Sequence, residues 1–469
     1  MAEESTGFAS ISAESLVNFR QRVKGTVSQP GDPEYNLSKW APNSIKPSKV
    51  IVTPAVVEDI AEAVKFARAQ GLTLGVRGGG HSSSTASATD GLLIDMRNMT
   101  LIRIDEPAKL AHIEAGARTN EVEAATIKHG LGACVGACSQ VSVGGYILSG
   151  GVGYSTGTYG LAADNLVAAT VVLATGEIAR ASESENPDLF WALRGGGSNF
   201  GVVSEVVVRL HPQRPDAYAI AYFYIPDKLP EVVEAIRQWL AVRKGHEAVQ
   251  LRFSLDMEGK PVVIVTGVSN STQEGGEKAF NRFRDIGPVK AINVQVPWQE
   301  VSNLANAANE IPGNKLCVGA HIDVFDFEQA KKAYDALMEL AKSAPFSIVI
   351  YEFYAFDKVA SVPVESAAFS QRDDFVNVIC GVFWMGEEFS PQARDECLKL
   401  KKVVSGSSST KAQESLGYVN TADIFSTLNE TDDYARKLFG PNYARLQQVK
   451  RKYDPDMVFD RWFAIRPAT

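Results

Sequence analysis

Apolar and polar positions in the first part of the chain alternate between short strand-like runs and helix-like stripes. The apolar run at 50–52 predicts a strand, and Thr53-Pro54 predicts the start of the next helix, with the threonine as its cap and the proline at its first position. Gly71 is expected to end that helix, and residues 72–76 form the following strand. Further strands are predicted at 92–95, 112–115, 168–174, 177–180 and 202–210, and further helices at 120–129 and 186–194.

The middle of the chain, at 214–417, has a different pattern, in which strand-like runs outnumber helical stretches. This pattern predicts a large, mostly antiparallel sheet with helices on one face, and therefore an α+β fold. The strands are expected at 218–225, 249–255, 262–268, 292–296, 320–324, 347–353 and 376–384, and the helices near 229–242, 272–284, 326–342 and 391–403. A short C-terminal part, 418–469, adds helices near 433–439 and 443–453.

Composition narrows the functional class. The net charge of −8 and the lack of a dense Lys/Arg cluster argue against a nucleic-acid partner. No apolar run reaches about 18 residues, so no membrane span is expected. The five cysteines imply no disulfide framework, and we expect no metal site. The N-terminus has neither a basic nor an apolar signal region, so a cytoplasmic location is expected, with a mature secreted form left open.

Glycines are clustered at 78–80, 144–157 and 195–201. Three glycines directly after a strand let successive backbone N–H groups turn toward one point, where they can bind a diphosphate. In the second cluster the spacing Gly151-x-Gly153-x-x-x-Gly157 does not match the dinucleotide fingerprint, so a nicotinamide site is disfavoured.

Several longer motifs carry a specific resemblance. They are RGGGHS at 77–82, IDMRNM at 94–99, the segments 136–165 and 190–206, YVN at 418–420, and the segment 440–459. These motifs follow one another in the same order as in a known family. On them the chain resembles the berberine-bridge-enzyme-like oxidases of the vanillyl-alcohol-oxidase/PCMH flavoprotein superfamily. The middle segment resembles them weakly.

The resemblance implies a two-domain PCMH-type fold with one FAD between the domains. Residues 1–213 and 418–469 would form the FAD-binding domain, and 214–417 the substrate domain. His81 matches the position that bonds to the flavin 8α-methyl group, and Cys138 matches the position that bonds to flavin C6 in doubly linked relatives. Ser142 stands where a glycine is more usual.

The same resemblance assigns the other cofactor contacts. They are Arg77, Gly78, Gly79, Gly80 and Ser82 at the diphosphate; Gly144, Gly145, Tyr146, Gly150, Gly151 and Gly153 along it; Asp164 and Asn165 near the flavin; Val203 at the adenine; and Tyr418 and Asn420 over the isoalloxazine ring.

The family reaction moves a hydride from a substrate C–H bond to flavin N5 while a base takes a proton, and O2 then accepts the electrons and gives H2O2. Some relatives carry a glutamate on a substrate-domain strand, whereas the counterpart here, 376–384, has no carboxylate. This departure argues against berberine-type ring closure. Tyr418 is the candidate base, and Glu352 and Tyr354 are candidates for its charged neighbour or for direct substrate contact.

The sequence therefore predicts an FAD-linked oxidase that acts on a small alcohol, amine or ring C–H of secondary metabolism. Two alternatives stay open: an oligosaccharide oxidase, and a flavoprotein cyclase for a pericyclic step without net redox change. The expected partners are a small-molecule substrate and molecular oxygen, and the oligomeric state is left open.

Overall fold

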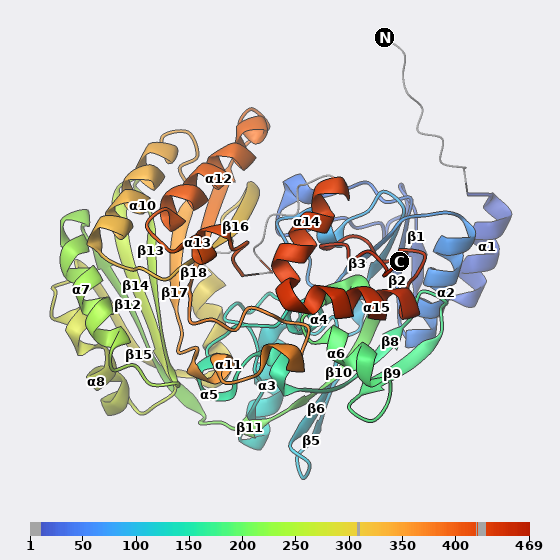
Figure 1. Ribbon diagram of the computed structural model, residues 1–469, viewed down its shortest axis with the longest axis horizontal. Coiled ribbons are helices and arrows are strands. Elements are labelled where there is room, and N and C mark those ends of the chain that lie inside the picture. Colours follow the sequence, from blue (N-terminus) through green and yellow to red (C-terminus); the bar gives the residue numbers. More distant parts are fainter. Residues whose placement is uncertain (1–10, 307–309, 419, 421–427) are drawn as a thin grey trace.

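The computed structural model describes residues 11–306, 310–418, 420 and 428–469. Val419 of the tail motif lies outside the described residues. Figure 1 shows two halves, one built from the first and last parts of the chain and the other from the middle. Within the described residues no helix is long and apolar enough to cross a membrane.

The first half contains two principal sheets. A four-stranded sheet has the order β1-β2-β4-β3, and its β2/β4 and β3/β4 pairs are parallel. A five-stranded antiparallel sheet has the order β5-β6-β10-β8-β9. The strands are β1 (Thr26–Ser28), β2 (Val50–Thr53), β3 (Leu74–Arg77), β4 (Leu92–Asp95), β5 (Ile102–Asp105), β6 (Leu110–Glu114), β8 (Leu166–Val172), β9 (Ile178–Ser182) and β10 (Val202–Arg209), with β7 (Leu131–Gly132) and β11 (His211–Pro212) as a separate pair. The helices are α1 (Ala13–Arg22), α2 (Val57–Ala69), α3 (Thr119–Thr126), α4 (Val143–Leu148), α5 (Thr156–Tyr159) and α6 (Pro187–Leu193).

The predicted start of α2 at Thr53-Pro54 is wrong, because the helix begins at Val57. The physical reason is Asp59, whose carboxylate accepts hydrogen bonds from the backbone N–H groups of Ala55 and Val56, at 2.8 and 3.3 Å. An acid in the first turn that binds these free N–H groups fixes the helix start three residues later than the Thr-Pro signal predicts. Gly71 follows the helix with φ +62°, in the left-handed region where glycine is favoured.

The middle segment forms one seven-stranded sheet of order β15-β12-β14-β13-β17-β18-β16, in which every neighbouring pair is antiparallel. Helices α7, α8, α10 and α12 cover its outer face (Figure 1), and their apolar side chains share one core with that face. The predicted α+β fold, with an antiparallel sheet covered by helices, is confirmed. The strands are β12 (Asp216–Tyr224), β13 (Glu247–Leu255), β14 (Pro261–Ser269), β15 (Lys290–Pro297), β16 (Asn314–Ile322), β17 (Ile348–Phe353) and β18 (Val376–Trp384). The helices are α7 (Leu229–Leu240), α8 (Gln273–Arg284), α10 (Phe327–Leu340), α11 (Asp357–Ala360), α12 (Ser390–Ser405) and α13 (Thr410–Glu414).

The inner face of this sheet points toward the other half of the molecule. In β13, Leu251 and Phe253 pack in the core beneath the helices, whereas Ala248 joins the core of the first half. Because side chains alternate along a strand, Gln250 and Arg252 lie on the same inner face as Ala248. The inner face is therefore where the two halves meet.

The C-terminal segment packs on the first half, where Figure 1 shows α14 (Leu428–Phe439) and α15 (Tyr443–Tyr453). Leu446 and Trp462 share a core with Phe200 of the first segment. Lys450, fully buried on α15, donates to the Asn199 carbonyl at 2.7 Å. These contacts support the division into 1–213, 214–417 and 418–469, which we retain as a proposal.

Candidate functional site

The loop 77–82 follows β3 and lies directly against the second glycine-rich segment. The Gly79 N–H donates to the Ser142 hydroxyl at 2.7 Å. A Cβ at Gly78 would lie 2.2 Å from the same hydroxyl oxygen, so a larger residue is excluded there. Gly80 has φ +67°, which turns the chain into His81. The hydroxyl of Ser142 therefore joins the two segments.

The side chain of Arg77 is turned away from this loop. Its guanidinium forms an ion pair with buried Asp95 at 2.8 Å and donates to the Asn36 carbonyl at 2.5 Å. Ser82 is similarly occupied, since its hydroxyl bonds to that of Ser84 at 2.8 Å. The side chain of Arg77 is therefore occupied elsewhere, and only its backbone can contribute to a diphosphate site.

The glycines of the second segment have different surroundings. A Cβ at Gly145 would meet no described atom within 4 Å, whereas one at Gly144 would lie 2.8 Å from the Ala115 carbonyl. The other predicted glycines are also enclosed: an added Cβ at Gly150, Gly151 or Gly153 would collide with Phe369, with Ala162 and Tyr146, or with Val135, respectively. Gly145 is thus the member of this set that faces open space.

His81 and Cys138 come together although 57 positions separate them in the sequence. The Cys138 Sγ lies 3.6 Å from His81 Nε2. The His81 ring also stacks on Trp40, with 4.5 Å between ring centroids and 10° between planes. Burial lowers the pKa of His81 to about 4, so the imidazole is neutral near pH 7. Burial also raises the pKa of the Cys138 thiol.

Tyr418 lies over the second glycine-rich segment. Its phenol oxygen accepts hydrogen bonds from the Val152 N–H at 3.2 Å and from Asn420 Nδ2 at 2.8 Å. Burial raises the pKa of Tyr418 to about 12, with these hydrogen bonds opposing the shift and the charge of Glu352 adding to it. Near neutral pH the phenol is therefore protonated.

Glu352 lies on the inner face of the sheet, in register with polar residues on both neighbouring strands. It is opposite Gln250 of β13 and Asn377 of β18. Gln250 Nε2 donates to its carboxylate at 3.0 Å and Asn377 Nδ2 at 2.5 Å, while the Tyr354 hydroxyl donates at 3.4 Å. Burial raises the pKa of Glu352, with these hydrogen bonds opposing the shift. The strand 376–384, which has no carboxylate of its own, thus lies beside the carboxylate of Glu352.

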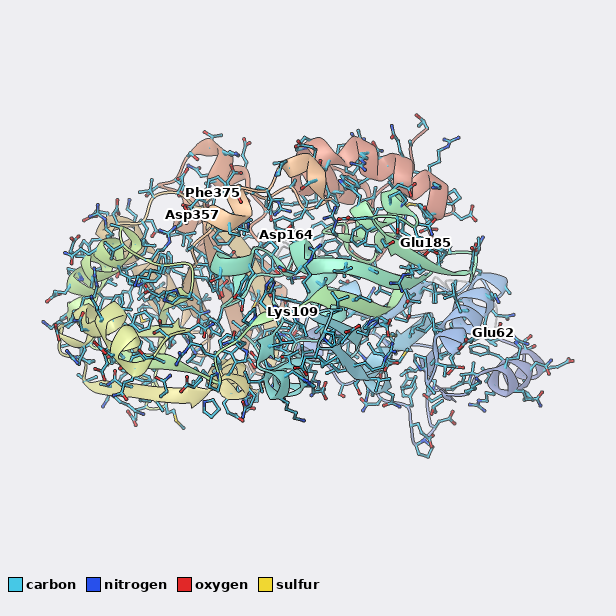
Figure 2. The ribbon with its side chains drawn as sticks, turned by 90° about the horizontal axis from the view of Figure 1, so that it is seen from below. Glu62, Lys109, Asp164, Glu185, Asp357 and Phe375 are labelled. Atoms are coloured by element: carbon cyan, nitrogen blue, oxygen red, sulfur yellow. The ribbon has the colours of Figure 1, made fainter. Side chains whose placement is uncertain are left out.

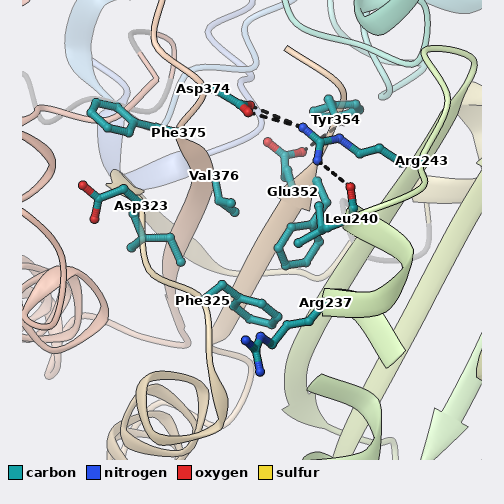
Figure 3. Close-up of a pocket in the computed structure, with 12 residues that line it drawn as sticks. Arg237, Leu240, Arg243, Asp323, Phe325, Glu352, Tyr354, Asp374, Phe375 and Val376 are labelled. Atoms are coloured by element: carbon teal, nitrogen blue, oxygen red, sulfur yellow. Dashed lines mark hydrogen bonds and ion pairs between the residues drawn. The ribbon is translucent and has the colours of Figure 1, made fainter. Parts of the chain in front are cut away.

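Three further tyrosines surround this carboxylate. Burial raises the pKa values of Tyr146, Tyr154 and Tyr354, and the charge of Glu352 contributes to each shift. A cavity of about 270 Å³ lies beside Glu352 and Tyr354. Figure 3 shows Glu352 near Arg243, whose guanidinium reaches the Asp374 carboxylate at 3.4 Å.

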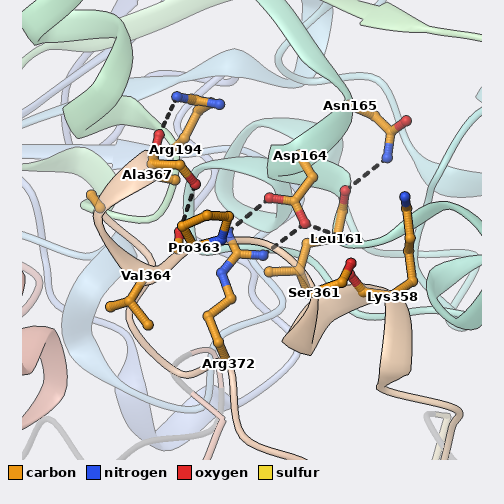
Figure 4. Close-up of polar contacts among 12 residues, drawn as sticks. Leu161, Asp164, Asn165, Arg194, Lys358, Ser361, Pro363, Val364, Ala367 and Arg372 are labelled. Atoms are coloured by element: carbon orange, nitrogen blue, oxygen red, sulfur yellow. Dashed lines mark hydrogen bonds and ion pairs between the residues drawn. The ribbon is translucent and has the colours of Figure 1, made fainter.

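Asp164 and Asn165 have structural partners. Asp164 binds Arg372 through two hydrogen bonds of 2.8 Å (Figure 4), and Figure 2 places Asp164 between the two halves of the molecule. Asn165 donates to the carbonyls of Tyr159 and Leu161 and accepts from His211. These contacts account for both residues without a cofactor.

Val203 lies in β10 immediately before a shift in strand register, which falls between Val203 and Glu205. Sequence reasoning gave no role to Trp40, Gln250 or Asn377. The fold brings Trp40 against His81, and Gln250 and Asn377 against Glu352.

Comparison with known proteins identifies the family. Residues 48–182 match the family model described as FAD binding domain, and residues 417–465 match the one described as Berberine and berberine like. The FAD-linked oxidoreductase pgmH of Aspergillus terreus is 30% identical over 490 aligned positions, which cover 98% of this chain and 97% of that protein. The chain belongs to the berberine-bridge-enzyme-like FAD-linked oxidoreductases.

Two further similarities concern oxidases. The (R)-6-hydroxynicotine oxidase of Paenarthrobacter nicotinovorans is 27% identical to this oxidoreductase over 95% of this chain and 97% of its own. The crystal structure of 6-hydroxy-D-nicotine oxidase from Arthrobacter nicotinovorans superimposes with a TM-score of 0.83 at 25% identity, covering 95% of this chain and 98% of that one. The resemblance inferred from the motifs is therefore confirmed.

The residues of this oxidoreductase fit an FAD molecule. Gly145 faces open space that a cofactor can fill, whereas the glycines of the loop 78–80 are packed against Ser142, Gln140 and Arg77. At the other end of the site, a neutral imidazole and a thiol converge from two different segments. Backbone N–H groups suit a diphosphate, and the converging pair suits the edge of the flavin ring.

Proposed function

We propose that this enzyme is an oxidase of small organic molecules that holds its FAD covalently through both His81 and Cys138, and that uses O2 as electron acceptor. The proposal is carried by the 3.6 Å approach of Cys138 Sγ to His81 Nε2. Carbon C6 and carbon C8, which bears the 8α-methyl group, belong to the same benzenoid ring of the flavin, with C7 between them. Two residues that bond to these positions must therefore converge, as this pair does.

The protonation state of His81 supports the histidyl linkage. The neutral His81 imidazole has a free nitrogen lone pair, and it is stacked on Trp40, which fixes its orientation. The Cys138 thiol is the weaker nucleophile because burial keeps it protonated.

Backbone groups of Gly78, Gly80 and Gly145 would hold the diphosphate, while the Gly79 N–H is held by Ser142. Val203 would lie at the adenine, and Tyr146, Tyr418 and Asn420 around the ring. Bound FAD supplies the two-electron acceptor. The protein supplies a base, and we assign that role to Glu352, with Tyr354 as its hydrogen-bonding neighbour. Burial raises the pKa of this carboxyl, so its ionised form is a stronger base than that of an ordinary glutamate and suits the acceptance of a substrate proton. Tyr418, with its pKa of about 12, is the second candidate and would first need to lose its own proton.

A small-molecule substrate is supported by the relatives named hydroxynicotine oxidases. The enclosed setting of Glu352, bounded by Gln250, Asn377 and Tyr354, also favours a small substrate over an oligosaccharide.

Acid precipitation tests the double linkage. Yellow flavin should remain with the denatured protein in the parent and in His81→Ala, and it should be released only from the double variant His81→Ala/Cys138→Ala. Cys134→Ala is the matched control, because this nearby thiol is buried in an apolar core and should not affect the linkage. Release of all flavin from the parent would refute both bonds, and release from His81→Ala alone would leave a single histidyl bond.

A further inference from the structure

Arg252 is an enclosed arginine that the reaction described above does not use. It lies on β13, two residues beyond Gln250, on the inner face of the sheet. Within the described part of the chain its side chain has no hydrogen bond or ion pair, and its Nε is buried without a partner. Burial lowers the pKa of Arg252 to about 10, and no carboxylate contributes to that shift.

Two other buried arginines have partners. Arg77 pairs with Asp95 at 2.8 Å, and Arg372 forms two hydrogen bonds with Asp164. An enclosed guanidinium without an acceptor is costly, because its five donors lose water and gain nothing in exchange. A bound anion would remove that cost.

The surroundings of Arg252 are open enough to admit a ligand. Its cross-strand neighbours Ile264 and Ile350 are only partly buried. At the edge of the same sheet, Ile292 is 42% exposed and Val294 is 38% exposed. By contrast, Leu251 and other outward-facing residues are fully buried under the helices. The inner face around Arg252 is thus a partly exposed apolar strip, in which Lys290, over the Phe223 ring at the edge of the sheet, is a second positive charge in the same cross-strand row.

We propose that Arg252 binds the carboxylate group of the substrate, so that the enzyme oxidises a small organic acid with an apolar body. This inference rests on the proposed function, because it places the substrate between the flavin and the inner face of the sheet. Arginine suits the role, since its planar fork forms paired, charge-assisted hydrogen bonds with a carboxylate.

The position of Arg252 relative to Glu352 limits the size of the substrate. Gln250 is opposite Glu352, so Arg252 is the diagonal neighbour of Glu352 on the same face. Diagonal neighbours of this kind are about 7–8 Å apart. A substrate whose carboxylate reaches Arg252 while its O–H or N–H reaches Glu352 must be compact, as a hydroxy acid or an amino acid is. Arg252 would then fix which hydrogen of the substrate faces the flavin.

Ligand titration of the oxidised holoenzyme tests this assignment. Acetate and benzoate are the charged probes, and acetamide and benzamide are their neutral counterparts, all followed by the change in the flavin absorption spectrum. The parent should bind the carboxylates more tightly than the amides. Arg252→Met should weaken carboxylate binding about 10- to 100-fold, as loss of a charge-assisted hydrogen-bonded pair does. The carboxylate affinity of Arg252→Lys should lie between those of the parent and of Arg252→Met.

The control is Arg282→Met. Arg282 is also partly buried with an unpartnered Nε, but it lies on α8 at the outer face of the sheet, so its loss should leave binding unchanged. Without ligand, Arg252→Met should melt at a higher temperature than the parent, because an unpaired enclosed charge has been removed. Carboxylates should raise the melting temperature of the parent and not that of the variant.

Equal carboxylate affinity in the parent and Arg252→Met would overturn the assignment, and so would failure of both carboxylates to bind the parent. These results are distinct from failure of the proposed oxidase. If hydroxy acids or amino acids reduce the flavin equally well in the parent and in Arg252→Met, the oxidase stands and the role of Arg252 falls. If carboxylates bind but no compound of any class reduces the flavin, the proposed oxidase falls.

Discussion

Replacement of Lys450 by methionine should destabilise the protein far more than the same change two residues away. Lys450 Nζ is fully buried and donates to three oxygens, those of Asn199, Asp454 and Phe459, at 2.7, 2.6 and 2.7 Å. Methionine preserves much of the volume and removes all three hydrogen bonds. It also leaves the Asp454 carboxylate buried with only two backbone N–H donors, those of Val458 and Phe459.

The size of the effect follows from these contacts. Removing one partner of a buried ion pair costs about 3–5 kcal/mol, and each orphaned carbonyl adds about 1 kcal/mol. The variant also no longer has to bury a charged ammonium group, which offsets part of this cost. We therefore expect the free energy of unfolding to fall by roughly 3 kcal/mol. With an m-value of about 3 kcal/mol/M, the urea midpoint should fall by roughly 1 M.

The matched control is Lys452→Met on the same helix. Lys452 is 58% exposed and pairs with Asp188 at the surface, so its loss should cost at most about 1 kcal/mol. Urea unfolding followed by tryptophan fluorescence measures both variants, since Trp462 lies in the affected core. Equal midpoints for the two variants would refute the conclusion that the C-terminal segment is locked into the first half, and with it the proposed domain division.

Three further predictions concern ionisable groups. Glu352→Gln should lower kcat/KM by about 10²–10⁴-fold and remove the rise of kcat/KM with pH that ionisation of this carboxyl produces; a parent-like pH profile would exclude Glu352 as base. Tyr418→Phe should cost only about 10-fold in turnover, because the phenol loses its hydrogen bonds from Val152 and Asn420 but no base is removed, and should retain FAD; a loss as large as that of Glu352→Gln would assign the base to Tyr418. Burial raises the pKa of Glu123 from 4.5 to about 8, so the folded protein holds a proton that the unfolded chain releases, and stability should fall as pH rises between these values. Melting temperatures at pH 6 and pH 8 should show this fall in the parent, and an equal fall in Glu123→Gln would contradict it.

Much of the fold was predictable because its signals are local. The strand-like runs of the middle segment correspond to the strands of one sheet. Each run could be recognised by itself, because apolar and polar residues alternate within it. The start of α2 was missed because two capping signals compete within a few residues. Only the structure shows that Asp59, and not Thr53, binds the free N–H groups.

The site was less predictable, because it depends on register and on long-range contact. His81 and Cys138 were identified from their motifs, but their approach to 3.6 Å requires the fold. The pairing of Gln250 with Glu352 depends on strand register between residues about a hundred positions apart, for which the sequence carries no local signal. A motif also cannot distinguish a glycine that faces a cofactor from one packed against protein, as the contrast between Gly145 and Gly150 illustrates.

The most direct test of the proposed oxidase is anaerobic mixing of the holoenzyme with matched small acids, alcohols, amines and sugars. We predict that the visible absorbance of the flavin falls with one small-molecule class, and that admission of air restores the colour with one equivalent of H2O2 per substrate oxidised. Conversion of a substrate while the flavin stays oxidised and no H2O2 forms would contradict the account and indicate chemistry without net redox change.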